Sequence, residues 1–170
     1  MNEIFRMTFL IELSVIAVTD IREKKISNRS VIFLCLTAAG FVLLYRKTDV
    51  MSHLLGAVCV SVPLLVTAIV VPGAFGMGDV KFMAAGGLFL GWERTVLSVI
   101  IACAACSLYI LIVWIFQTIY QKRITGKGIG RKVLHRKTEL AFGAFLAVGM
   151  AVSLLWGEQL INWYQNSPFY

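Results

Sequence analysis

Long apolar runs alternate with short polar segments along the whole chain, and this pattern predicts membrane helices. The longer runs approach the ~20 residues that a helix needs to cross the hydrocarbon core of a bilayer. Six runs are present, at residues 4–19, 31–45, 54–71, 80–92, 95–119 and 140–156. The polar segments between them leave little room for a soluble domain. We therefore predict an all-α, polytopic membrane protein whose six transmembrane helices form a single domain over residues 1–170.

The fourth run is short and follows a break rich in proline and glycine. Residues 80–92 cover only ~20 Å of a hydrocarbon core that is ~30 Å thick. Pro72 has no amide donor, and the glycines of 73–78 allow unusual backbone conformations, so the helix is expected to resume near Asp79. Irregular backbone at membrane depth is tolerated only where protein buries it or where it lines a water-filled cavity. The break therefore predicts a solvated pocket within the membrane.

Composition supports the membrane assignment. Hydrophobic residues make up 59% of the chain and charged residues only 15%, against about a quarter charged in ordinary soluble domains. We expect the first run to be a retained helix and not a signal peptide, because Glu12 lies inside it and no small-residue cleavage site follows. The net charge of +7 resides in loops beside apolar runs, which argues for lipid headgroups and against nucleic acid as the partner.

The cysteines predict neither a metal site nor a redox centre. Cys103 and Cys106 have the spacing of such a pair, but they have no second pair and no nearby histidine. We interpret them as small residues that pack one helix against another, and we expect no cofactor. His53 is interpreted as a solvated cap at the start of the third run, and His135 lies in the basic loop at 121–138 without an identifiable partner.

The basic residues also predict how the helices are oriented. Twelve of the 16 lysines and arginines fall in the segments 20–29, 72–81 and 118–139, which six alternating spans would place on one side of the membrane. The other side has four: Arg6, Arg46, Lys47 and Arg94. By the positive-inside rule the first side is cytoplasmic and both termini are extracytoplasmic. Asp20 and Asp79 are then expected at the same, cytoplasmic face of the cell membrane.

Asp20 and Asp79 are the candidate catalytic residues. A charged side chain at the centre of a membrane helix costs about 2.5–3.5 kcal/mol on insertion. An acid at or near membrane depth therefore indicates function. Two carboxyl groups held close together share a proton, because both cannot ionise cheaply. Such a pair can hold a water molecule that attacks a peptide carbonyl without a metal. Glu12 is expected to have the structural role of a hydrogen bond to a neighbouring helix.

Residues around Asp79 are expected to support this chemistry. Gly76 and Gly78 would let a substrate backbone approach closely, and the start of the following helix offers free amide donors. Lys81 either moderates the negative potential of the acids or faces lipid headgroups, and the sequence favours neither role.

The segment Gly76-x-Gly78-Asp79-x-Lys81 resembles the GxGD motif of intramembrane aspartyl proteases, in the form found in type IV prepilin peptidases and archaeal preflagellin peptidases. Residues 84–92 are similar to the segment that follows the motif in this family. Asp20 with Ile26-Ser27-Asn28 resembles the family's first catalytic region, although Ser27 stands where a proline is usual.

The resemblance implies that Asp20 and Asp79 form a catalytic dyad. It also implies that the substrates are prepilin-like or preflagellin-like proteins, whose short basic leader is cleaved after a glycine. Long members of the family carry paired CxxC motifs between the first two helices and also methylate the product. Here that loop spans only residues 20–29 and has no cysteine. We therefore expect a peptidase of the short form, without methyltransferase activity.

Two other classes of protein fit some of these features. A small transporter or channel would use Asp20 and Asp79 as a proton or cation site. A structural membrane scaffold would use the glycines for close helix packing and the acids as buried hydrogen-bonding groups. The sequence leaves open the particular substrate, the oligomeric state and the distance between the two acids.

Overall fold

A computed structural model describes residues 2–24, 26–45, 49–71, 76–125 and 141–166. The described residues form six helices: α1 (Asn2–Glu23), α2 (Asn28–Tyr45), α3 (Val50–Val70), α4 (Met77–Leu90), α5 (Trp92–Thr125) and α6 (Phe142–Gln165). No strand occurs within these ranges. The predicted all-α class and the number of helices are confirmed. Most of the basic loop at 121–138, including His135, lies outside the described residues.

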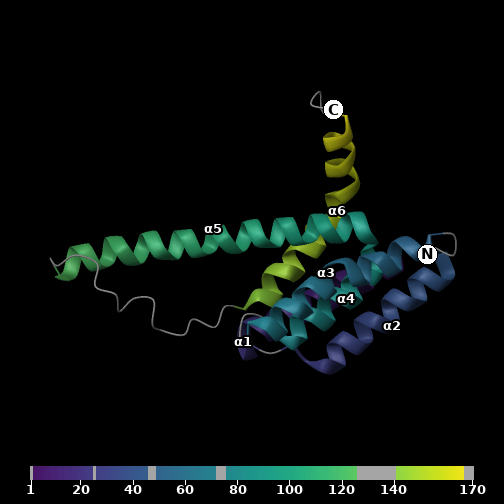
Figure 1. Cartoon of the computed structure of the whole chain (residues 1–170), viewed down its shortest axis with the longest axis horizontal. Coiled ribbons are helices and arrows are strands. Elements are labelled where there is room, and N and C mark those ends of the chain that lie inside the picture. Colours follow the sequence, from purple (N-terminus) through teal and green to yellow (C-terminus); the bar gives the residue numbers. More distant parts are fainter. Residues whose placement is uncertain (1, 25, 46–48, 72–75, 126–140, 167–170) are drawn as a thin grey trace.

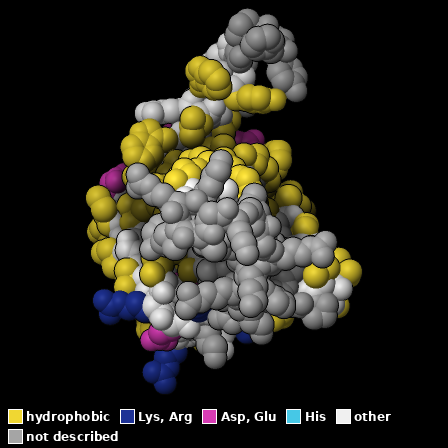
Figure 2. Space-filling view, turned by 90° about the vertical axis from the view of Figure 1, so that its left-hand side faces the viewer, with side chains coloured by type: hydrophobic (Ala, Val, Ile, Leu, Met, Phe, Trp, Pro, Cys, Tyr) yellow, Lys and Arg dark blue, Asp and Glu magenta, His cyan; other side chains and the backbone are white. Residues whose placement is uncertain are grey.

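Four of the helices are long and apolar enough to cross a membrane. They cover Asn28–Tyr45, Val50–Val70, Trp92–Ile119 and Phe142–Tyr164. Figure 1 shows α1 to α4 side by side, with α5 crossing them and its C-terminal half extending well beyond them. The side chains along that half are largely apolar and exposed, among them Leu111, Trp114 and Phe116. In Figure 2 apolar side chains are visible along the upper, left and right parts of the face, and lysine and arginine side chains are visible mainly at its lower left.

Aromatic stacking joins helices that are distant in the sequence. Phe89 of α4 stacks on Phe9 of α1, with ring centroids 4.1 Å apart, and on Phe41 of α2, at 4.6 Å. Offset or stacked aromatic pairs of this kind stabilise a fold beyond the area they bury. Phe9 and Phe89 are both buried, so this stack forms the centre of the core.

Glycines let two pairs of helices approach closely. A Cβ atom at Gly56 of α3 would lie 2.6 Å from the carbonyl oxygen of Gly87 of α4, and one at Gly87 would collide with the backbone of Gly56. A Cβ at Gly149 of α6 would likewise collide with the carbonyl oxygen of Ser98 of α5. Small residues at helix crossings are the usual means of close packing in membrane proteins. These contacts hold α4 against α3 and α6 against α5.

The helix boundaries differ from the apolar runs in instructive ways. The fourth helix begins at Met77, two residues before Asp79. Gly76 has the extended backbone conformation of an N-cap residue, so the helix starts directly after it. It ends at Leu90, where Gly91 adopts a φ of +81°, a left-handed conformation that favours glycine. The fifth helix continues past the apolar run to Thr125.

Several side chains outside the acid pair also had roles assigned from the sequence. Glu12 accepts a hydrogen bond from Thr37 Oγ1 of α2 at 2.8 Å, as its predicted structural role requires. The interpretation of His53 as a solvated cap is wrong. Its side chain is only 5% exposed, and Nδ1 lies 2.9 Å from the carbonyl oxygen of Leu88, because α4 packs over the start of α3. Cys103 is exposed and is therefore not a packing residue, and both it and Cys106 are free thiols.

Candidate functional site

Asp20 is buried and tied to a helix far along the chain. It lies in the last turn of α1, is 5% exposed, and its Oδ2 accepts a hydrogen bond from the backbone amide of Ala144 at 2.9 Å. The amide of Gly143 is a second backbone donor to this carboxylate. Both amides belong to the first turn of α6, where amide groups have no partner within the helix. Asp20 therefore caps α6 from another helix.

Asp79 is buried in the first turn of α4. It is 9% exposed, and its Oδ2 accepts a hydrogen bond from the backbone amide of Gly76 at 3.3 Å. Gly76 has no side chain with which to cap the helix, so the carboxylate reaching back to its amide supplies a capping contact. Gly76 is thus a backbone donor to Asp79, a role that the sequence did not predict, and the close approach of a substrate backbone to Gly76 and Gly78 stays a prediction.

Ile26 joins the two acid-bearing regions. An ideal Cβ at Gly78, the residue before Asp79, would lie 3.1 Å from Cβ of Ile26. An ideal Cβ at Gly143 would lie 2.8 Å from Cδ1 of the same side chain. One isoleucine therefore packs against the first turns of both α4 and α6.

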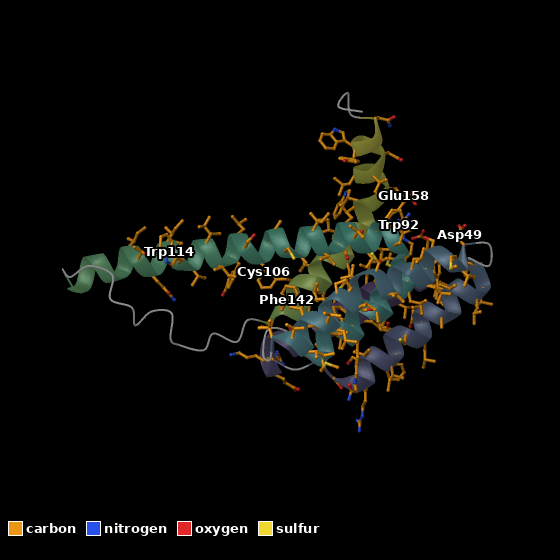
Figure 3. The ribbon with its side chains drawn as sticks, viewed as in Figure 1. Asp49, Trp92, Cys106, Trp114, Phe142 and Glu158 are labelled. Carbon is orange, nitrogen blue, oxygen red and sulfur yellow. The ribbon has the colours of Figure 1, made fainter. Side chains whose placement is uncertain are left out.

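Lys81 lies at the same end of the molecule and is exposed. Its Nζ donates a hydrogen bond to Oδ1 of Asn28 at 3.4 Å, which links the start of α4 to the start of α2. Figure 3 shows Phe142, at the start of α6, near the end of α1, while Asp49, Trp92 and Glu158 lie at the opposite end of the bundle. The end of α1 and the starts of α2, α4 and α6 thus share one end.

The structure brings Asp20 and Asp79 into the same electrostatic environment. Neither residue lies in the four helices that are long and apolar enough to span a membrane. Burial raises the pKa of Asp79 to about 6; the amide of Gly76 opposes this shift, and the negative charge of Asp20 adds to it. Burial also raises the pKa of Asp20, against the hydrogen bonds from Ala144 and Gly143. Two buried acids of which one raises the pKa of the other can act as a proton-sharing pair.

The arrangement suits acid and base catalysis on a polar bond. Burial keeps both carboxyl groups protonated more readily than exposed acids would be, while the amide donors to each favour its ionised form. Within the described part of the chain, no three His, Cys, Asp or Glu side chains gather closely enough to hold a metal ion.

The contribution of α6 was not predicted from the sequence. Gly143 and Ala144 lie 123 and 124 residues after Asp20, and no spacing rule connects residues so far apart. A local signal was present, since Phe142-Gly143-Ala144 opens an apolar run after a polar segment and has no Ser, Thr, Asp or Asn directly before it to cap the helix. A helix start without its own cap indicates that another part of the fold supplies one.

These features define a helical membrane protein with two buried, interacting acids at one end of its bundle. The model of the Type IV leader peptidase family matches residues 7–111, and the chain belongs to this family. The matched region contains both Asp20 and Asp79 and ends before α6 begins.

Curated relatives agree with this assignment. The chain is 34% identical over 89 residues to a prepilin leader peptidase/N-methyltransferase of Legionella pneumophila, covering 52% of this chain and 26% of the relative. It is 29% identical over 158 residues to a prepilin leader peptidase/N-methyltransferase of Bacillus subtilis, covering 93% of this chain and 58% of the relative. The chain thus spans between about a quarter and three fifths of these two relatives' length. No solved structure matches it significantly.

The cap that Asp20 provides to α6 makes a testable contribution to stability. Asp20→Ala removes the acceptor for the amide of Ala144, whereas Asp20→Asn keeps a side-chain oxygen there and removes only the charge. We expect the free energy of unfolding of Asp20→Ala to be lower than that of Asp20→Asn by about 1 kcal/mol, the usual contribution of a helix cap. Thermal unfolding of the two detergent-solubilised variants measures the difference. Equal stability of the two variants would show that the cap contributes nothing.

Proposed function

We propose that the protein is an intramembrane aspartic endopeptidase that removes the short basic leader from prepilin-like or preflagellin-like proteins. The observation that carries the proposal is the placement of Asp20 and Asp79, which are both buried at one end of the bundle, where the charge of Asp20 raises the pKa of Asp79. Membership of the leader peptidase family and the names of the relatives support the same reaction.

The two acids would divide the work of hydrolysis. The ionised carboxylate takes a proton from a water molecule while the oxygen of that water attacks the carbon of the scissile carbonyl. The protonated carboxyl group donates its proton to the carbonyl oxygen. The proton then passes to the leaving amine as the peptide bond breaks. Asp20, held by the amides of α6, is suited to be the ionised member, and Asp79, with a pKa near 6, is suited to carry the proton.

The substrate would approach with its leader at the polar end of the bundle. Exposed lysine and arginine side chains gather at this end, among them Arg22, Arg29 and Lys81. By the positive-inside rule this end faces the cytoplasm, which places both termini outside and the cleavage site at the cytoplasmic membrane face. The adjoining apolar surface would hold the hydrophobic helix that follows the leader in the lipid bilayer. Cleavage after a glycine is the expectation that the family resemblance supplies.

Conservative substitution of either acid tests the dyad. Asp20→Asn and Asp79→Asn each keep the shape of the side chain but remove the group that gains or loses a proton. We expect each variant to lose leader removal by at least ~10²-fold while remaining folded. Co-expression with a prepilin-like substrate, followed by the size and N-terminal sequence of the product, measures this loss.

Glu12→Gln is the matched control for these two variants. It alters a third acid in α1 that bonds to Thr37 and takes no part in the proposed chemistry. Processing should remain close to that of the wild type. Substantial processing by Asp20→Asn or Asp79→Asn would refute the dyad and favour transport of protons or cations through the same acids.

The rate of processing should depend on pH in two directions. Because burial and the charge of Asp20 raise the pKa of Asp79 to about 6, the pair loses its shared proton as the pH rises through that value. The rate should therefore fall on the alkaline side of about 6 and fall again at lower pH, where both carboxyl groups become protonated. Initial rates in liposomes measure the profile. A rate that does not change as the pH passes through 6 would contradict this assignment.

We further propose that the protein does not methylate its product. The connection between α1 and α2 is only a few residues long and contains no cysteine. Mass spectrometry of the processed N-terminus, with and without a methyl donor, tests this. We expect identical masses, and a gain of one methyl group that depends on the donor would disprove the proposal.

A further inference from the structure

Gly143, in the first turn of α6, lies directly against the carboxylate of Asp20. An ideal Cβ atom at this position would lie 2.9 Å from Oδ2 of Asp20, closer than real Cβ atoms approach, and 3.1 Å from its Cγ, which is tighter than most real contacts. We propose that Gly143 is a positioning residue for Asp20: its missing side chain lets the carboxylate reach the amides that hold it. This inference rests on the proposed peptidase function.

The close approach of Asp20 to Gly143 also serves the start of α6, because it brings the carboxylate to the helix amides. Ala141, the residue before α6, makes no side-chain capping hydrogen bond, so the usual cap from the N-cap side chain is missing at this helix start. Oδ2 of Asp20 fills that role by accepting from Ala144 at 2.9 Å. A methyl group at position 143 would stand only 2.9 Å from this oxygen, too close for both to keep their places. The carboxylate would then have to rotate or retreat, and the amide of Ala144 would lose its acceptor.

The position of Asp20 relative to Asp79 follows from the same packing. Ile26 fills the space between Gly143 and Gly78, and Gly78 immediately precedes Asp79. The packing therefore sets how far the start of α6, with Asp20 attached to it, stands from the start of α4. Small displacements matter for such chemistry, because a shift of ~1 Å in a catalytic group can cost ~10²-fold in rate.

Other glycines of α6 meet different neighbours and provide a control. A Cβ at Gly157 would lie 3.3 Å from Oγ of Ser153 and 3.5 Å from Cγ of Arg94, contacts that need little or no adjustment. Gly157 lies toward the C-terminal end of the helix, away from Asp20. Gly143→Ala and Gly157→Ala therefore make the same chemical change in the same helix. Gly143→Ala creates a clash with the Asp20 carboxylate, and Gly157→Ala does not.

Steady-state processing of a prepilin-like substrate by the full-length protein in liposomes tests the proposal. Gly143→Ala should lower kcat by roughly tenfold to a hundredfold and leave KM within twofold of wild type, because the acid moves while the binding surface does not. Gly157→Ala should match the wild type in both. An unchanged kcat in Gly143→Ala, or a change confined to KM, overturns the proposal.

A second variant separates the carboxylate from Ile26, because a Cβ at Gly143 would also come within 2.8 Å of the Ile26 Cδ1. Ile26→Val removes that methyl group and leaves the clash with Asp20. We expect Gly143→Ala to lower kcat by the same factor in the Ile26→Val background as it does in the wild type. Restored kcat in the double variant would show that packing on Ile26 is the constraint, and would overturn the proposed role toward Asp20.

Chemical labelling without substrate distinguishes failure of this inference from failure of the proposed function. A hydrophobic carbodiimide reacts with protonated carboxyl groups, and mass spectrometry of the α1 peptide quantifies labelling at Asp20. The acid that faces Asp20 from another element is Asp79 on α4, and the first turn of α6 carries no titratable group. At one pH, Gly143→Ala should label several-fold more than wild type or Gly157→Ala, since the lost amide donors no longer favour the ionised form.

Equal labelling in all three proteins overturns the positioning role even if the wild type is an active peptidase. Increased labelling in Gly143→Ala with no cleavage by the wild type leaves the positioning role intact and removes the proposed peptidase function.

Discussion

The hydrogen bond between the Asp20 carboxylate and the amide of Ala144 is the contact on which the end of the molecule that carries the two candidate acids depends. It connects residues 124 positions apart and joins the end of α1 to the start of α6. Buried carboxylates are costly unless donors surround them, and buried amides at a helix start are costly unless an acceptor reaches them. Each group relieves the cost of the other, so the acid and the helix start are held in place together.

Much of this arrangement follows from the sequence, and the limits have physical causes. The six apolar runs and the polar break before Asp79 predict the helices, because membrane helices must satisfy their own backbone groups over a length set by the bilayer. Loop charge asymmetry predicts that Asp20 and Asp79 share one end, and both are found there. The partners of Asp20 do not follow, because α6 reaches it only through the packing of the whole bundle. His53 illustrates the same limit, since its burial depends on α4 lying across the start of α3.

The family comparison and the structure cover different parts of the site. The family model extends over residues 7–111 and includes both acids, the glycines before Asp79 and Lys81. It stops before α6, where the donors to Asp20 lie. The family match therefore covers both candidate acids, and the geometry adds the element that holds one of them.

The close glycine contacts join the helices that position the two acids. The crossing of Gly56 and Gly87 holds α4 to α3, and Gly149 holds α6 to α5. Asp79 lies in the first turn of α4, and Asp20 accepts a hydrogen bond from the first turn of α6. A larger residue at either crossing would push a whole helix away from its neighbour and would therefore move Asp79, or the donors to Asp20, without changing any residue at the site.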